Sequence, residues 1–98
     1  MTKMYKYLYK KMYDDLKDAE MLIDYACHMK EEGLEDVAKY FAENAVYRLS
    51  KSFKEAHALF TTHATQEKGF TEEELTRFRE YLDRLTQNIV DLVDENTK

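Results

Sequence analysis

The sequence predicts an all-α fold, an up-down-up bundle of three antiparallel helices in a single domain spanning residues 1–98. The chain has 98 residues, no proline and only two glycines, Gly33 and Gly69. Because proline and glycine are the residues that most often end helices, long helices are expected on either side of these glycines. A chain of this length suffices for one domain and is too short for two. Both predicted connections are only a few residues long, so neighbouring helices must run antiparallel.

The first helix is expected over about residues 3–32. Its apolar residues recur at alternating intervals of four and three, the period of a helix face that is buried along its length. These positions are Tyr5, Tyr9, Met12, Leu16, Ala19, Ile23 and Ala26. A flanking line with an interval of seven reads Leu8, Asp15, Leu22 and Met29, so one aspartate interrupts an apolar line. Gly33 is expected to end this helix in a left-handed conformation, with Leu34 folded back on the last turn.

The second helix is expected over about residues 35–67, with Glu35 and Asp36 in the first turn, where the helix dipole favours acids. Small residues dominate its inner line, which allows another helix to approach closely. The line reads Leu34, Ala38, Phe41, Ala45, Arg48, Ser52, Ala56 and Leu59. Arg48 therefore interrupts the middle of an otherwise small or apolar face.

The third helix is expected over about residues 72–94. Thr71 followed by Glu74 forms a capping-box sequence, and Phe70 with Leu75 is placed to form the hydrophobic staple around it. The seam that follows contains no polar residue and reads Leu75, Phe78, Leu82, Leu85, Ile89 and Leu92. Residues 95–98 are expected to fray.

The formal net charge is −5, which argues against a dedicated nucleic-acid binder, because affinity for nucleic acid depends on neutralising phosphates. Residues 1–13 depart from this average, since they carry four lysines and no acid. Lysine alternates with tyrosine over residues 3–11, a pattern that would also suit RNA or an anionic membrane surface. On a helix, however, the tyrosines and the lysines point to different sides. The interpretation that we favour is an ordinary amphipathic start of a helix.

A cytoplasmic location is expected. The single cysteine, Cys27, rules out a disulfide within the chain and suits a reducing compartment. There is no apolar run long enough to cross a membrane, and the charged start lacks the apolar core of a secretion signal.

Two short stretches carry a resemblance to a known family. KEEGL at 30–34 and FAENA at 41–45 match, without a gap, the Lys-Lys-Asp-Gly-Phe and Phe-Ala-Glu-Thr-Ala stretches of a helical hairpin. This hairpin resembles the first one of the ferritin-like superfamily, in particular that of the rubrerythrins. The resemblance implies a helical bundle in which a Glu-x-x-His pair and a carboxylate of the first helix hold iron.

The positions that this resemblance implies for the metal ligands carry the wrong residues. The glutamate position falls on Arg48, the histidine position on Lys51, and the carboxylate of the first helix near Asp15. A cationic side chain has no free lone pair for a metal. The resemblance therefore implies a ferritin-like hairpin that has lost its metal site, and no metal or other cofactor is expected.

Asp15 and Arg48 are candidates for a buried structural pair. In a hairpin that turns at Gly33, Asp15 lies level with Ser52, and Arg48 lies about one turn away. One hypothesis is that the two charges pair inside the bundle, because burying either alone would be costly. The alternative is that Arg48 lies at the edge of the seam and extends to water, with its stem covering Ala45.

Metal ligands could also come from other polar side chains. Glu20, Asp24 and His28 are spaced by four and share one helix face, which is equally the pattern of a solvated face. His28 and His57 would be roughly 27 Å apart along the hairpin, so only an oligomer could join them. Cys27 and His28 are adjacent on the helix and diverge, which excludes a catalytic dyad between them, and Cys27 is interpreted as an apolar filler. No catalytic residue is assigned.

The function that the sequence favours is a small non-enzymatic protein that works by protein–protein association. The width of the apolar face of the first helix, to which Tyr13, Tyr25 and Cys27 contribute, predicts a homodimer; no further partner is specified. The alternative is a metal-binding or redox protein that assembles ligands across an oligomer. Its candidate ligands are Glu20, Asp24, His28, Glu43 and His57.

Overall fold

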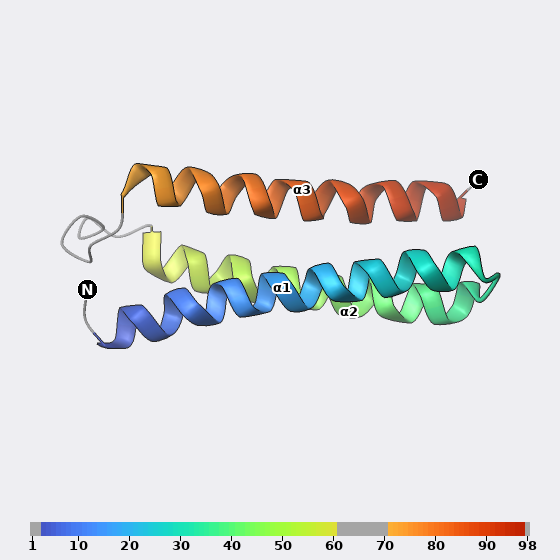
Figure 1. Cartoon of the computed structure of the whole chain (residues 1–98), viewed down its shortest axis with the longest axis horizontal. Coiled ribbons are helices and arrows are strands. Elements are labelled where there is room, and N and C mark those ends of the chain that lie inside the picture. The colour runs from blue at the N-terminus through green and yellow to red at the C-terminus, as the bar shows by residue number, and fades with distance from the viewer. Residues whose placement is uncertain (1–2, 61–70, 98) are drawn as a thin grey trace.

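The computed structural model describes residues 3–60 and 71–97, which form three α-helices. They are α1 (Lys3–Glu31), α2 (Glu35–Phe60) and α3 (Glu72–Thr97). Each helix runs antiparallel to the one before it, so that the described chain goes up, down and up again (Figure 1). The prediction of an all-α bundle of three helices is confirmed.

The turn between α1 and α2 is a Schellman motif centred on Gly33. Gly33 has a φ of 80°, the left-handed conformation that glycine adopts without strain. Its N–H donates to the carbonyl of Lys30 at 3.0 Å, and the N–H of Leu34 donates to that of Met29 at 2.9 Å. These two bonds satisfy carbonyl groups that the end of a helix leaves free. Leu34 therefore folds back on the last turn through its backbone N–H, while its side chain keeps 49% of its surface exposed.

The third helix begins where the sequence predicts. The hydroxyl oxygen of Thr71 accepts a hydrogen bond of 3.1 Å from the N–H of Glu74, which is one half of the capping box. The Glu74 side chain accepts a 3.3 Å hydrogen bond from the Thr71 hydroxyl. The helix continues to Thr97, beyond the expected end at residue 94. Phe70 of the predicted staple and residues 61–67 of the predicted second helix lie outside the described residues.

α1 and α2 form the most closely packed pair, and α3 lies farther from both (Figure 1). The close approach follows from small buried side chains, which are Ala19 and Ala26 on α1 and Ala38, Ala42, Ala45, Ser52 and Ala56 on α2. The buried side chains of α3 are large, namely Phe78, Leu85, Ile89 and Leu92, so they hold its axis at a greater distance.

Aromatic and charged contacts attach α3 to α1. Tyr13 packs against Phe78 with ring centroids 5.7 Å apart and the rings nearly perpendicular, a favourable edge-to-face arrangement. Further along both helices, Glu20 accepts hydrogen bonds from the Tyr81 hydroxyl at 3.2 Å and from Arg84 at 2.8 Å. The Arg84 guanidinium in turn lies 4.9 Å from the centre of the Tyr81 ring. These contacts determine which face of α3 packs against α1.

Across the described helices, none combines the length and the apolar character that crossing a membrane would require.

Candidate functional site

The structure brings Asp15 and Arg48 together. The Asp15 side chain is fully buried, and its Oδ1 lies 3.4 Å from Nη1 of Arg48 and 3.9 Å from Nζ of Lys11. The Arg48 side chain keeps 37% of its surface exposed. The arrangement therefore has features of both alternatives, because the guanidinium reaches the buried carboxylate while part of the side chain stays in water.

A second buried polar contact lies beside this pair. Ser52, which is fully buried, donates a hydrogen bond of 2.9 Å from its hydroxyl to the carbonyl oxygen of Met12. Met12 and Asp15 are neighbours on one face of α1, one turn apart. The hydroxyl is thus satisfied without a water molecule, and a small side chain suits this close contact between the helices.

Glu55 completes the cluster and was not among the predicted site residues. Both of its carboxyl oxygens and Oδ2 of Asp15 are buried, with no hydrogen-bond partner among the described residues. Burial, followed by the proximity of the Asp15 carboxyl group, raises the pKa of Glu55 to about 7, against the opposing effect of Lys11 and Lys51. Two carboxyl groups in contact are stable when they carry one proton between them. Hence this cluster is suited to hold a proton.

The five candidate ligands of the metal alternative are not gathered by one chain. Glu20 is engaged by Tyr81 and Arg84 of α3, and Nε2 of His28 lies 4.0 Å from Glu32. Asp24 is exposed on α1, and Glu43 and His57 are exposed on α2. Within residues 3–60 and 71–97, no three His, Cys, Asp or Glu side chains are placed to hold a metal ion.

Cys27 is exposed, so its interpretation as an apolar filler is wrong. It lies on α1 next to the buried Ala26, one position outside the buried face. The lysines at the start of α1 do not all lie on one exposed surface, as a site for nucleic acid or a membrane would require. Lys6 and Lys10 are exposed, but Lys11 turns towards the buried Asp15.

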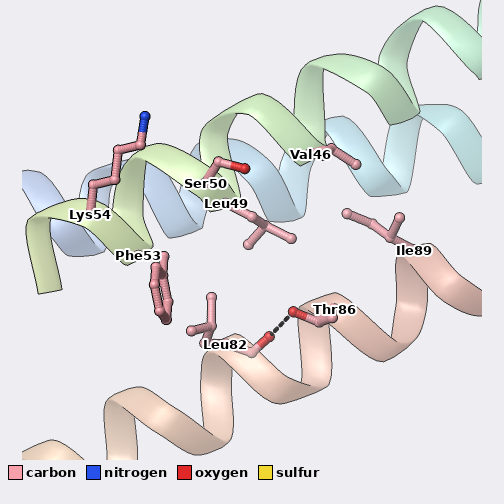
Figure 2. Close-up of a pocket in the computed structure, with 8 residues that line it drawn as sticks. All are labelled: Val46, Leu49, Ser50, Phe53, Lys54, Leu82, Thr86 and Ile89. Carbon is pink, nitrogen blue, oxygen red and sulfur yellow. Dashed lines mark hydrogen bonds between the residues drawn. The ribbon is translucent and has the colours of Figure 1, made fainter. Parts of the chain in front are cut away.

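An apolar groove, which we call the α2–α3 groove, lies between these two helices. It consists of two adjoining hollows of about 450 and 370 Å³. Phe53 and Leu82 line both hollows, so the two are continuous. In Figure 2, Phe53 and Leu49 of α2 face Leu82 of α3, and Val46 faces Ile89.

The side chains at this groove expose a large apolar surface. Phe53 keeps 56% of its surface exposed and Val46 keeps 46%. Ten large apolar side chains in the described part of the chain are exposed, and five of them lie on α2. Those five are Val37, Tyr40, Val46, Tyr47 and Phe53. Three more, Tyr7, Met21 and Tyr25, lie on α1, so the exposed apolar surface expected on the first helix is present there but its larger described share is on α2.

The groove was not predicted from the sequence. Phe53 lies outside the predicted inner line of the second helix. It belongs to a second apolar line, which reads Ala42, Val46, Leu49, Phe53 and Ala56 and was not identified. It becomes part of a surface only because α3 stands far enough from α2 to leave Phe53 and Leu82 uncovered.

Comparison of the chain with models of known protein families, with curated proteins and with solved structures finds no match.

Proposed function

We propose that this chain is a small, non-enzymatic, cytoplasmic protein that acts by protein–protein association through the α2–α3 groove. The observation that carries the proposal is the half-exposed Phe53 above an apolar hollow that continues along both helices. Exposed aromatic side chains in a concave apolar surface are the usual anchors of protein interfaces. The groove also has the shape of a site for one face of an amphipathic helix.

An occupant that covers the exposed apolar side chains of the α2–α3 groove would gain substantial binding free energy. Fully burying a phenylalanine or valine side chain stabilises by about 1.5–3 kcal/mol relative to leaving it exposed. Phe53 and Val46 are each about half exposed, so an occupant that covers both would gain roughly half of that amount at each position. Leu82, which is only partly buried in the groove wall, would add to this gain.

The resemblance to the ferritin-like hairpin supports a bundle used as a scaffold. Arg48 and Lys51 stand at the positions implied for metal ligands, and the Arg48 guanidinium is directed at Asp15. For the alternative function, a metal-binding or redox protein with ligands shared across an oligomer, the described residues of one chain bring no three candidate ligands together. One of its candidates, Glu20, is already paired with α3.

Site-specific photo-crosslinking tests the proposal. Phe53→p-benzoylphenylalanine places the reactive group in the groove, and Tyr7→p-benzoylphenylalanine provides the matched control on the exposed side of α1. In cells, we expect an adduct at position 53 whose partner peptide can be sequenced, and none of that mass at position 7. The adduct should disappear when Val46→Glu is added, because the charge enters the same groove. No adduct at position 53, or the same adduct at both positions, would contradict association through the groove.

A further inference from the structure

This inference depends on the proposed function and names the occupant of the groove. We infer that the α2–α3 groove binds a second copy of this chain. The two copies are related by a two-fold axis parallel to the helices, so that α2 of each copy lies over α3 of the other. Together, α2 and α3 of both copies then form a four-helix arrangement with the grooves closed inside it.

The register of α2 against α3 is the basis of the inference. Phe53 faces Leu82, and Val46 faces Ile89, so seven residues along one helix correspond to seven along the other (Figure 2). A two-fold axis parallel to the helices leaves these levels unchanged. Phe53 of one copy therefore meets Leu82 of the second copy, and the same contact is repeated on the other side of the axis.

The exposed valines match in the same register. Val90 follows Ile89 on α3 and keeps 43% of its surface exposed, close to the exposed fraction of Val46. Because Ile89 marks the level of Val46, Val90 of a second copy would lie over Val46. Two exposed apolar side chains on one copy are thereby covered by two on the other.

The charges at the groove are complementary under the same symmetry. Lys54 follows Phe53 on α2, and Asp83 follows Leu82 on α3, so the two lie at nearly one level on opposite sides of the groove. Lys54 points away from α3 of its own chain (Figure 2). In the parallel arrangement, Lys54 of each copy meets Asp83 of the other, which gives two ion pairs. A two-fold axis across the helices at this level would bring Lys54 against Lys54 and Asp83 against Asp83.

The available area is sufficient for a stable dimer. α2 and α3 each have 26 residues and are therefore about 39 Å long at 1.5 Å per residue. With helices about 10 Å across, a face two helices wide has an area of roughly 800 Å². Stable interfaces bury about 800 Å² on each partner, so this face alone reaches the usual size.

Analytical ultracentrifugation of the purified full chain tests the arrangement through a charge swap. We expect the unaltered protein to form a dimer. Lys54→Asp and Asp83→Lys should each raise the dissociation constant about tenfold or more, because each change replaces two ion pairs with two repulsive contacts. The double variant should return to within about threefold of the starting value, since both pairs are restored with the signs exchanged.

Lys17→Asp, an exposed charge reversal on α1, serves as the control and should leave the dissociation constant unchanged. A monomer at every concentration would overturn the inference, as would a dimer that neither single reversal weakens or that the double variant does not recover. The proposed function has a separate outcome. A sequenced adduct of position 53 with a different protein would leave association through the groove standing while excluding the second copy.

Discussion

The hydroxyl of Ser52 on α2 donates a hydrogen bond of 2.9 Å to the main-chain carbonyl of Met12 on α1, and neither side chain is exposed to solvent. The contact joins the two helices through the backbone of one of them, so the helix axes must lie close at this level. Only a small polar side chain can occupy the position. A larger one would separate α1 from α2, and an apolar one would leave out the hydrogen bond.

Ser52→Ala and Ser52→Val should therefore differ in cost. The alanine variant loses one buried hydrogen bond, and we expect the free energy of unfolding to fall by about 0.5–1.5 kcal/mol. The valine variant also inserts volume into a closely packed contact, and its total loss should exceed that of alanine by about 1–3 kcal/mol. Urea unfolding followed by circular dichroism would measure both. Equal losses in the two variants would show that the helices can separate here without strain.

Removal of the Arg48 charge should destabilise the α1–α2 pair. Arg48→Met leaves the buried Asp15 with Lys11 at 3.9 Å as the only other described ion-pair partner. Breaking a fully buried ion pair costs about 3–5 kcal/mol. Since Arg48 is partly exposed and its contact of 3.4 Å is long, we expect a smaller loss of about 1–2 kcal/mol. Lys39→Met, an exposed cation on the same helix, is the control in the same unfolding measurement.

A double-mutant cycle separates the pair from the individual side chains. Asp15→Asn removes the charge that Arg48 neutralises, so Arg48→Met should cost less in that background than in the unaltered protein. A coupling energy of about 1 kcal/mol is expected for groups in direct contact. Additive losses would mean that the two side chains act independently despite their proximity.

The carboxyl pair of Asp15 and Glu55 should make stability depend on pH. The pKa of Glu55 is about 7 in the folded protein, above its ordinary value of 4.5. Between these values the folded state keeps a proton that the unfolded state has lost. Stability is therefore greatest at low pH with respect to this group. It declines as the pH rises from about 4.5 to 7 and levels off above that range, with a slope of at most about 1.4 kcal/mol per pH unit for one proton.

Thermal unfolding from pH 4.5 to 8 would measure this dependence. Glu55→Gln is neutral at every pH and should remove the decline, because the amide can donate to Asp15 without a titrating proton. Glu80→Gln, an exposed position on α3, should keep the decline of the unaltered protein. A decline that persists in Glu55→Gln would assign it to other groups.

The contact of Glu20 with α3 should contribute locally. Glu20→Ala removes hydrogen bonds to Tyr81 and Arg84, both partly exposed to solvent. We expect a loss of about 1–2 kcal/mol, with faster amide hydrogen exchange in α3 and little change at the α1–α2 contact. Glu73→Ala breaks an exposed pair within α3, with Arg77, and should cost less than about 0.5 kcal/mol. If Glu20→Ala increased the amide exchange rates of all three helices equally, relative to the unaltered protein, that result would argue against a local role.

The sequence predicted the helices well because their signals are local. The absence of proline, the turn at Gly33 and the cap at Thr71 each act within one turn of the chain. The seam of the third helix is also local, since six apolar residues recur at one period, and Phe78, Leu85, Ile89 and Leu92 are buried as expected. The inner line of the second helix was incomplete, because Ala42 and Leu49 are buried as well. A single line describes a helix with one neighbour, and α2 has two.

The candidate sites depend on the distances between helices, and the spacing of apolar residues along one helix does not predict those distances. The hairpin register that places Arg48 one turn to one side of Asp15 places Glu55 one turn to the other side. The hairpin register therefore indicated that Glu55 lies near Asp15. It was not selected because a single glutamate on a helix is usually exposed to solvent. The α2–α3 groove had only a partial signal, a second apolar line through Val46, Leu49 and Phe53. Its existence depends on the different spacing of α1 and α3 from α2, which the sizes of many side chains determine together.

Gly33 has a consequence that concerns stereochemistry rather than space. A Cβ atom added at this position would meet no atom within 4 Å, so the turn excludes other residues only through the φ of 80°. At position 33 the backbone conformation, rather than contact of a Cβ atom, therefore selects glycine. A chain made by chemical synthesis with D-alanine at this position would keep the turn and would lose less conformational freedom on folding than glycine does. The mirror-image side chain would be the stabilising one, at a point where every L-residue is strained.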